Sequence, residues 1–322
     1  MNKNFEDIAI DRIAWSDTRY KLTFRRAPES LIVSVREMGV LNPLIVAESS
    51  DPDRFTIVTG WLRFAAAREG GAETVPCHAY RNFAPKILLL CSLFDNLGHR
   101  AMNPIEQALA LGSLSDHYSR AEIISNFLPL LGCQPHAENW EKIMRLAGLC
   151  EELKWAVADG ALSPQAARIL AGLPKEAGEQ AWRLMRSVSM TASLQNETAE
   201  LFNDLWKRDG LAPSAIISGE DWARFADDPP ANPARAAHIV REGLRRRRFP
   251  RLTQMERGYA ASVRALKLPS RAAISPTHGF ESRKQKLEVQ FDSPEQLSAA
   301  LKQITSACES GQIRAIFKTM EE

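Results

Sequence analysis

The chain has 322 residues, enough for two or three domains that each have a core of their own. Hydrophobic residues make up 45% and charged residues 25%, which is typical of a globular protein and excludes a largely disordered one. The formal net charge is +2. No apolar run approaches the roughly 20 residues of a membrane-spanning helix, and the first residues lack a signal-peptide pattern.

These features predict a cytoplasmic protein with no membrane partner. The five cysteines are scattered along the sequence without the spacing of metal ligands, so we expect them to be reduced. The six histidines never combine with a carboxylate or a cysteine in a spacing that suits a metal, and we therefore expect no metal site.

The first informative feature is a glycine between a strand-like and a helix-like run. Residues 55–58 are apolar and β-branched, Thr59 and Gly60 follow, and a helix-like run then continues to residue 69. A glycine at this position exposes backbone N–H groups at the start of a helix, and Arg63 adds positive charge nearby. The pattern suits the binding of a phosphate group. The alternative interpretation is an ordinary strand–helix junction with an arginine on the surface.

Several segments around this junction match a known family in the same order along the chain. They are Ile13-Ala14-Trp15 with Arg19, residues 31–46, residues 57–60, Val75-Pro76, Asp95-Asn96 and residues 103–108. Together they resemble the ParB family, and ordered matches over roughly 100 residues are more specific than a single motif. The resemblance implies an α+β, ParB/sulfiredoxin-like N-terminal domain over residues 1–102, opened by a short strand at residues 13–15.

The resemblance also implies a nucleotide pocket. In CTP-binding members of the family, charged residues near the glycine surround the nucleotide phosphates, so CTP with Mg²⁺ is the cofactor implied for this chain. The residues at the matching positions are Thr59, Gly60, Arg63, Asp95, Asn96, His99 and Arg100.

The sequence departs from the family at several of these positions. Where the family has G-E-R-R, Trp61 and Leu62 replace the acid and the first arginine. His99 occupies the position of a later arginine, and Arg100 lies one residue further on. Because a helix turns about 100° per residue, Arg100 points elsewhere unless the backbone adjusts. Leucine and histidine also lack the forked grip of a guanidinium on phosphate. We therefore expect nucleotide binding with weak or no hydrolysis, and the catalytic residues are unknown.

Residues 103–208 predict a mainly α-helical middle domain, because apolar residues recur at three- and four-residue spacing. Asn103-Pro104 followed by Glu106 is typical of a helix start. Residues 121–128 and 136–144 occupy the places of the family's helix-turn-helix pair. The expected recognition helix carries two carboxylates near its start, which makes it a poor reader of duplex DNA. A helical bundle kept for packing is the favoured alternative.

Two further features point to DNA. Residues 162–170 resemble a family helix that contacts DNA, and Arg168 matches its arginine. Residues 241–286 hold 13 Lys and Arg against 3 Asp and Glu, a net charge of +10. Such a concentration attracts polyanions, although a solvated helix end paired with acidic regions would have the same composition. The residues that we expect to contact DNA are Arg168, Arg245, Arg246, Arg247, Arg248 and Arg251.

The rest of the chain predicts a turn-rich linker over residues 209–240 and a basic C-terminal region over 241–322. Residues 287–291 alternate as a half-buried strand does, and residues 297–307 have amphipathic helical spacing. This small α/β segment is too short to form a core of its own, so we expect it to dock on the rest of the chain or on a second copy. Members of the family dimerise through their C-termini, and a homodimer is implied here by the resemblance alone, without matching residues in this segment.

Three functions from different classes follow. The first is a ParB-like DNA-associated protein of the chromosome or plasmid partition type, with an altered nucleotide switch. The second is an enzyme on the same fold, for example a weak NTPase, a phosphotransferase or a nuclease. The third is a non-catalytic adaptor for other proteins.

Overall fold

The computed structural model describes residues 2–49, 51, 53–216, 225, 231–280, 283–309, 311 and 313–319. The contacts within the chain divide it into two units, Met1–Ala237 and His238–Glu322. Among the described residues, no helix is long and apolar enough to span a bilayer.

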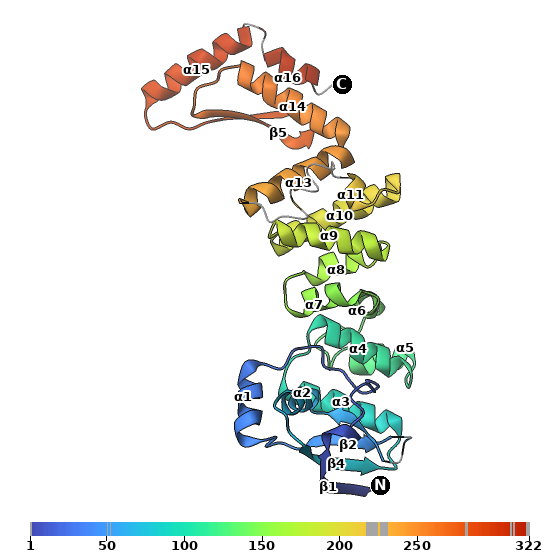
Figure 1. Ribbon diagram of the computed structural model, residues 1–322. Coiled ribbons are helices and arrows are strands. Elements are labelled where there is room, and N and C mark those ends of the chain that lie inside the picture. Colours follow the sequence, from blue (N-terminus) through green and yellow to red (C-terminus); the bar gives the residue numbers. More distant parts are fainter. Residues whose placement is uncertain are drawn as a thin grey trace. The chain divides into compact units, whose positions relative to one another are not determined.

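The first unit begins with a four-stranded mixed sheet, as expected for an α+β domain (Figure 1). The strand order is β1-β4-β2-β3, in which β1 is antiparallel to β4, and β2 is parallel to β4 and antiparallel to β3. The strands are β1 (Asn2–Ala9), β2 (Leu44–Glu48), β3 (Phe55–Thr59) and β4 (Thr74–Arg81). The helices are α1 (Glu29–Met38), α2 (Trp61–Glu69) and α3 (Pro85–His99).

The core of this domain lies between the sheet and its helices. Leu44, Ile57 and Val75 from three strands are fully buried, and Phe64 from α2 packs in the same cluster. The apolar run at residues 55–58 is buried at every position, which explains why its hydrophobic pattern is continuous rather than alternating.

The opening strand differs from the expectation. The first strand is β1, and Ile13 forms only one isolated parallel bridge with Phe55 after the short 3₁₀ helix η1 (Ile10–Arg12). The Ala14 N–H donates to the Phe55 carbonyl at 2.8 Å. Residues 13–15 therefore fix the start of a loop along the edge strand and do not extend the sheet.

The middle of the chain is helical, as predicted. Asn103 caps α4, because its side chain accepts from the N–H groups of Ile105 and Glu106 while Glu106 accepts from the Asn103 N–H. The helices are α4 (Pro104–Ser115), α5 (Arg120–Glu122), the π-helical turn η2 (Ile123–Phe127), α6 (Ala137–Ala147), α7 (Glu151–Ala158), α8 (Pro164–Leu170), α9 (Lys175–Ser187), α10 (Ala192–Asp209) and α11 (Pro213–Ile216).

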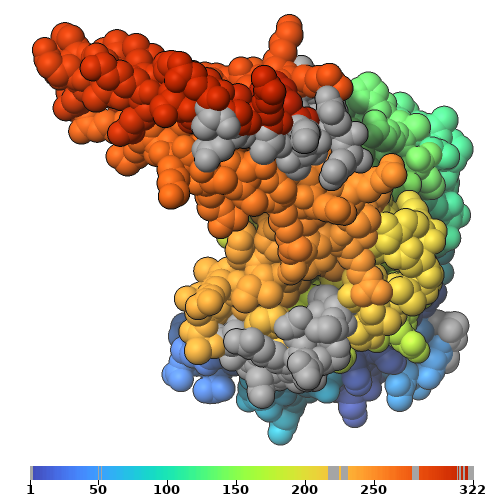
Figure 2. All heavy atoms as spheres, turned by 90° about the horizontal axis from the view of Figure 1, so that it is seen from above, coloured from blue at the N-terminus to red at the C-terminus, as the bar shows by residue number. Residues whose placement is uncertain are grey.

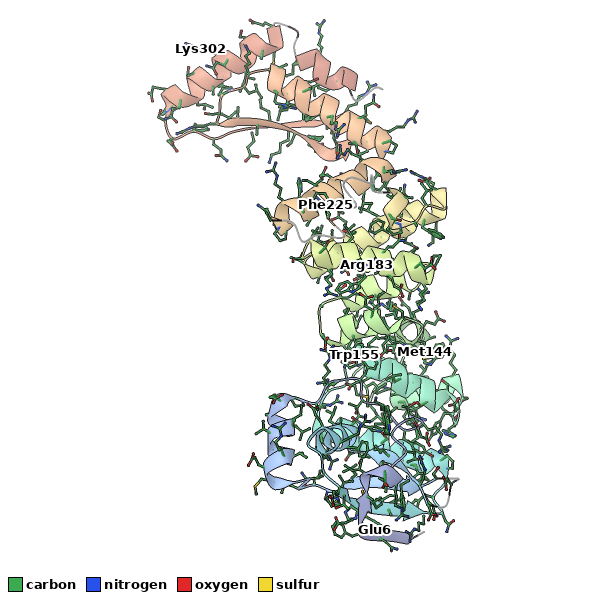
Figure 3. The ribbon with its side chains drawn as sticks, viewed as in Figure 1. Glu6, Met144, Trp155, Arg183, Phe225 and Lys302 are labelled. Carbon is green, nitrogen blue, oxygen red and sulfur yellow. The ribbon has the colours of Figure 1, made fainter. Side chains whose placement is uncertain are left out.

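An aromatic contact joins this helical region to the N-terminal domain. The rings of Phe24 and Trp155 lie 4.3 Å apart, and the Arg26 guanidinium lies 5.1 Å from the centre of the Trp155 ring. Figure 3 shows Trp155 on α7 near the end of the helical region that meets this domain. The loop between η1 and α1 is therefore packed against α7.

The second unit contains a β-hairpin and helices around a small core of Tyr259, Leu266, Ala307 and Ile316. Figure 2 shows its atoms from above in orange to red. The expected strand corresponds to β6, which pairs with a preceding strand that the sequence pattern did not predict. The elements are α13 (Pro233–Arg248), which crosses the boundary between the units, α14 (Pro250–Ala265), β5 (Ala272–Phe280), β6 (Gln285–Val289), α15 (Pro294–Glu309) and α16 (Ile313–Thr319).

Part of the expected linker lies outside the described residues, namely residues 217–224 and 226–230.

Candidate functional site

Gly60 joins β3 to α2 in a conformation that favours glycine. Its φ is +95° and its ψ is 21°, in the left-handed region. A Cβ atom at this position would lie 2.9 Å from the Leu44 Cγ and 3.3 Å from an Arg63 guanidinium nitrogen. Both the backbone angle and the close packing therefore require glycine, which brings the start of α2 next to a cavity.

This cavity has a volume of about 560 Å³, and we call it the glycine cavity. Its walls come from three strands (β2, β3 and β4), from α1, α2 and the end of α3, and from the loops before α1 and β2. All of the residues that the family resemblance implied for a nucleotide line it: Thr59, Gly60, Arg63, Asp95, Asn96, His99 and Arg100. The fold thus gathers residues from two segments that lie more than 30 positions apart in the sequence.

Arg63 is held at the wall of the glycine cavity by backbone acceptors. One guanidinium nitrogen donates to the carbonyls of Asn42 at 2.7 Å and Pro43 at 2.9 Å. These contacts fix the loop before β2 and orient the guanidinium, so its charge is available at a defined position beside Gly60. The contribution of this loop could not be read from spacing alone.

Asn96 is oriented by three hydrogen bonds. Its Nδ2 donates to the Ser92 carbonyl at 2.8 Å, and its Oδ1 accepts from the Thr23 hydroxyl at 3.0 Å and from Arg100 at 3.3 Å. A side chain held in this way presents a fixed polar surface to the glycine cavity.

The backbone adjusts at Arg100. Helix α3 ends at His99, and Arg100 is extended, with φ −168° and ψ 163°. An extended residue does not follow the 100° helical step, so Arg100 turns to the glycine cavity although it lies one position beyond the family arginine. His99 is 74% exposed, and its Nδ1 lies 2.7 Å from the backbone oxygen of Asp95 and 4.0 Å from a carboxylate oxygen of the same residue.

Arg100 makes a two-point ion pair with Glu106, a residue whose role the sequence did not predict beyond a helix start. The distances are 2.6 and 2.7 Å, and Glu106 is fully buried. Burial alone would raise the pKa of Glu106, but hydrogen bonds from Arg100 and from the N–H groups of Asn103 and Phe24 outweigh it, so the pKa lies below its usual value. Arg25 adds a second cation, 3.3 Å from the same carboxylate.

The family resemblance aligns Trp61 with an acidic residue of the family. Trp61 is only 8% exposed and belongs to the buried cluster of the domain, so it acts there as a packing residue. Among the described residues, no group of three or more His, Cys, Asp or Glu is placed to hold a metal ion. Mg²⁺ commonly binds through nucleotide phosphates with one or two carboxylates, and Asp95 is the carboxylate that lines the glycine cavity.

The expected recognition helix, α6, carries ion pairs at its start. Glu138 pairs with Lys142 and Glu141 pairs with Arg120, each at 2.6 Å. The Asn139 amide donates to the Gln134 carbonyl. The two carboxylates are thus partly neutralised by ion pairs within the chain. Asn139, the side chain there that could read a base, is already bonded to a backbone carbonyl.

Arg168 lies half-buried on α8. Loss of hydration lowers the pKa of its guanidinium, and repulsion from Arg145 on α6 lowers it further. Arg145 is exposed. The sequence did not indicate its proximity to Arg168, because the two residues come together only when α6 packs against α8.

The basic residues around 245–251 follow the end of α13 and the start of α14. Arg245 pairs with Glu256 at 2.8 Å, and the Arg248 guanidinium lies 4.7 Å from the centre of the Phe249 ring. Arg246, Arg247 and Arg251 are exposed. The cluster therefore lies where α13 ends and α14 begins, and it is not part of an extended tail.

Known proteins resemble just under half of the chain. Stage 0 sporulation protein J of Bacillus subtilis (strain 168) is 34% identical over 141 residues, which cover 44% of this chain and 47% of that protein. The chromosome-partitioning protein ParB of Caulobacter vibrioides (strain NA1000 / CB15N) is 32% identical over 152 residues, which cover 46% of this chain and 48% of that protein. The chain thus spans about half the length of the curated relatives it matches.

One solved structure is a C-terminally truncated ParB from Caulobacter crescentus complexed with CTP-gamma-S. It is 26% identical, covers 55% of this chain and 98% of its own, and superimposes with a TM-score of 0.28, which is too low to equate individual residues. The family model for the ParB N-terminal domain matches residues 1–97. Together with the mixed sheet and its covering helices, this match shows that residues 1–97 form a ParB N-terminal domain.

Proposed function

We propose that the glycine cavity binds a nucleoside triphosphate, and that the chain is a DNA-associated protein of the partition type. The observation that carries the nucleotide proposal is the convergence of Gly60, Arg63, Asn96 and Arg100 on one cavity. A glycine allows close approach of phosphate to the backbone, and guanidinium groups form charge-assisted hydrogen bonds with phosphate oxygens. The family resemblance favours CTP, accompanied by Mg²⁺.

Hydrolysis is expected to be slow or absent. Trp61 supplies no carboxylate to organise a metal ion, and its indole is buried in the core. Arg100 is also committed to Glu106, which leaves less of its charge for the transition state of phosphoryl transfer. The nucleotide therefore acts as a bound ligand rather than a rapidly consumed substrate.

DNA binding is assigned to phosphate contacts. Arg246, Arg247 and Arg251 are exposed close together in the sequence, whereas the start of α6 offers ion pairs instead of base-reading groups. Phosphate contacts position a protein on DNA without specifying sequence. The arginines that we assign to these contacts are Arg245, Arg246, Arg247, Arg248 and Arg251, with Arg168 and Arg145 as a secondary basic site.

A fluorescence titration of the full chain with CTP, ATP, GTP and UTP, each with Mg²⁺, tests the nucleotide proposal. We expect saturable binding with CTP preferred over the other three nucleotides. Absence of affinity for every one of the four at millimolar concentration would end the proposal. Equal affinity for all four would leave a phosphate site but refute the preference for CTP.

A further inference from the structure

A second cavity, of about 780 Å³, borders the same helix as the first. It lies between the loop that precedes α1 and the side of α2 that carries Trp61, Ala65 and Arg68. We call it the indole cavity. It shares Thr23, Trp61 and Leu62 with the glycine cavity, but none of the arginines proposed there to bind phosphate lines it.

The indole cavity has an excess of positive charge. Lys21, Arg25, Arg26 and Arg68 line it, against one acidic side chain, Glu69. Arg25 is paired with Glu106, whereas in the described part of the chain Lys21, Arg26 and Arg68 form no ion pair. Each instead lies over an aromatic face. The cation-to-centroid distance is 5.1 Å for Lys21 over Trp61 and 4.3 Å for Arg68 over Trp15. The cations in this cavity outnumber its one carboxylate, and such an excess of positive charge attracts an anion.

Two tryptophans, Trp15 and Trp61, line the indole cavity and differ in exposure. Trp15 is 56% exposed, which is a large apolar area for a side chain covered on one face by Arg68. Trp61 is more than nine-tenths buried, and its Nε1 has no hydrogen-bond partner among the described residues. A buried N–H without an acceptor is costly, and this one lies below the cavity surface, so the exposed Trp15 ring is the aromatic group that a ligand can reach.

We propose that the indole cavity is a second ligand site, which binds a nucleoside polyphosphate independently of the glycine cavity. Lys21, Arg26 and Arg68 hold the phosphates, and the planar base packs on the Trp15 indole. The cavity combines cations with aromatic rings beside them, and this combination suits a ligand that carries both negative charge and a flat ring. The cavity volume lies within the usual range for small-molecule sites.

The test counts bound nucleotide per chain by equilibrium dialysis of the full-length protein with labelled CTP or ATP. Four proteins are compared: the wild type, Arg63→Ala, Lys21→Gln/Arg68→Gln, and the triple variant that combines these changes. Arg54→Gln is the matched control, since Arg54 is an exposed arginine that lines neither cavity. Circular dichroism confirms that each variant is folded.

We expect the wild type to bind two nucleotides, either site variant to bind one, and the triple variant to bind none. These occupancies hold at a nucleotide concentration near the wild-type Kd, where a site with a Kd raised about tenfold or more is nearly empty. In the Arg63→Ala background, the Lys21→Gln/Arg68→Gln changes should raise the Kd by that factor, because two charge-assisted contacts are lost. Trp15→Leu should weaken nucleotide binding at this site but leave the affinity for inorganic triphosphate unchanged.

Different results separate the two sites. If Arg63→Ala abolishes all binding, or if Lys21→Gln/Arg68→Gln changes neither stoichiometry nor affinity, the indole cavity is not a site. If Arg63→Ala has no effect while Lys21→Gln/Arg68→Gln removes the bound nucleotide, the second site stands and the glycine cavity fails. Equal affinity for inorganic triphosphate and for nucleotides would overturn the role of the ring.

Discussion

Arg100 connects the wall of the glycine cavity to the first helix of the helical region through Glu106. Its guanidinium meets both carboxylate oxygens, at 2.6 and 2.7 Å, and reaches the Asn96 Oδ1 at 3.3 Å. Glu106 lies in the first turn of α4, and Asn96 lies on α3. One side chain is therefore shared between the candidate nucleotide site and the start of the helical region.

Removing the charge of Glu106 should destabilise the fold. Glu106→Gln leaves Arg100 and Arg25 next to an uncharged, buried group, and loss of one partner from a buried ion pair costs about 3 kcal/mol or more. Urea denaturation at pH 7 measures the free energy of unfolding. Glu141→Gln is the control, because its pair with Arg120 is about half exposed and should cost less than about 1 kcal/mol. Equal losses in both variants would contradict the assigned role of the buried pair.

Gly60→Ala should lower both stability and nucleotide affinity. The positive φ of residue 60 and the 2.9 Å approach to Leu44 impose a strain of about 1–3 kcal/mol on any side chain. Gly98 lies within α3 with no atom near its added Cβ, so Gly98→Ala should stabilise the protein by about 0.5–1 kcal/mol. Thermal denaturation should give a lower Tm for Gly60→Ala and a higher Tm for Gly98→Ala. Tm shifts in the same direction for both variants would contradict the geometry at Gly60.

Asp17 should give a pH-dependent contribution to stability. A hydrogen bond from Arg19 is the largest cause that lowers its pKa from 3.8 to about 2, and the Thr56 hydroxyl adds a further bond. Because the folded pKa is below the unfolded one, the contribution is complete above about pH 4 and is lost as the pH falls through about 2.

Asp17→Asn should therefore reduce the free energy of unfolding at pH 7, by about 1 kcal/mol because Arg19 is largely exposed. The difference from the wild type should shrink as denaturation is repeated from pH 4 towards pH 2. A difference that grows on acidification would have the wrong sign for this account. The exposed Asp11 supplies the control variant Asp11→Asn.

DNA binding should depend steeply on salt and little on sequence. Each phosphate contact on duplex DNA contributes a log–log slope of roughly −0.9. Replacing Arg245, Arg246, Arg247 and Arg248 by alanine should flatten this slope and weaken binding equally on unrelated duplexes, measured by fluorescence anisotropy. Substitutions of Glu138 or Asn139 should have little effect. If those substitutions abolish binding to one particular site while the arginine variants bind normally, α6 is a sequence reader and the assignment is wrong.

Nucleotide hydrolysis should be slower than about 1 per second, below the turnover of ordinary enzymes. The reason is the buried indole of Trp61 at the position of the family's acid. Release of inorganic phosphate from CTP with Mg²⁺ measures the rate. Rapid turnover that Arg63→Ala removes would show that other residues organise the metal and the phosphates.

The sequence predicted the N-terminal fold and the lining of the glycine cavity because both depend on local motifs in a fixed order. It did not predict the contacts of Glu106 with Phe24 and Arg25 or the packing of Arg68 on Trp15, because these partners come from distant segments. The turn of Arg100 into the cavity depends on where α3 ends, and helix ends are the least predictable boundaries. Strand β5 was missed because Pro276 and Gly279 are unfavourable within a strand.

Isothermal titration of the full chain with CTP and Mg²⁺, comparing Arg63→Ala with Arg54→Ala, tests the central claim most directly. Both residues are arginines of the N-terminal domain, but only Arg63 lines the glycine cavity. The account predicts that Arg63→Ala weakens CTP binding about tenfold or more, or about 1.4 kcal/mol, while Arg54→Ala binds as the wild type does. Equal CTP affinity in the wild type and both variants would contradict a nucleotide site beside Gly60.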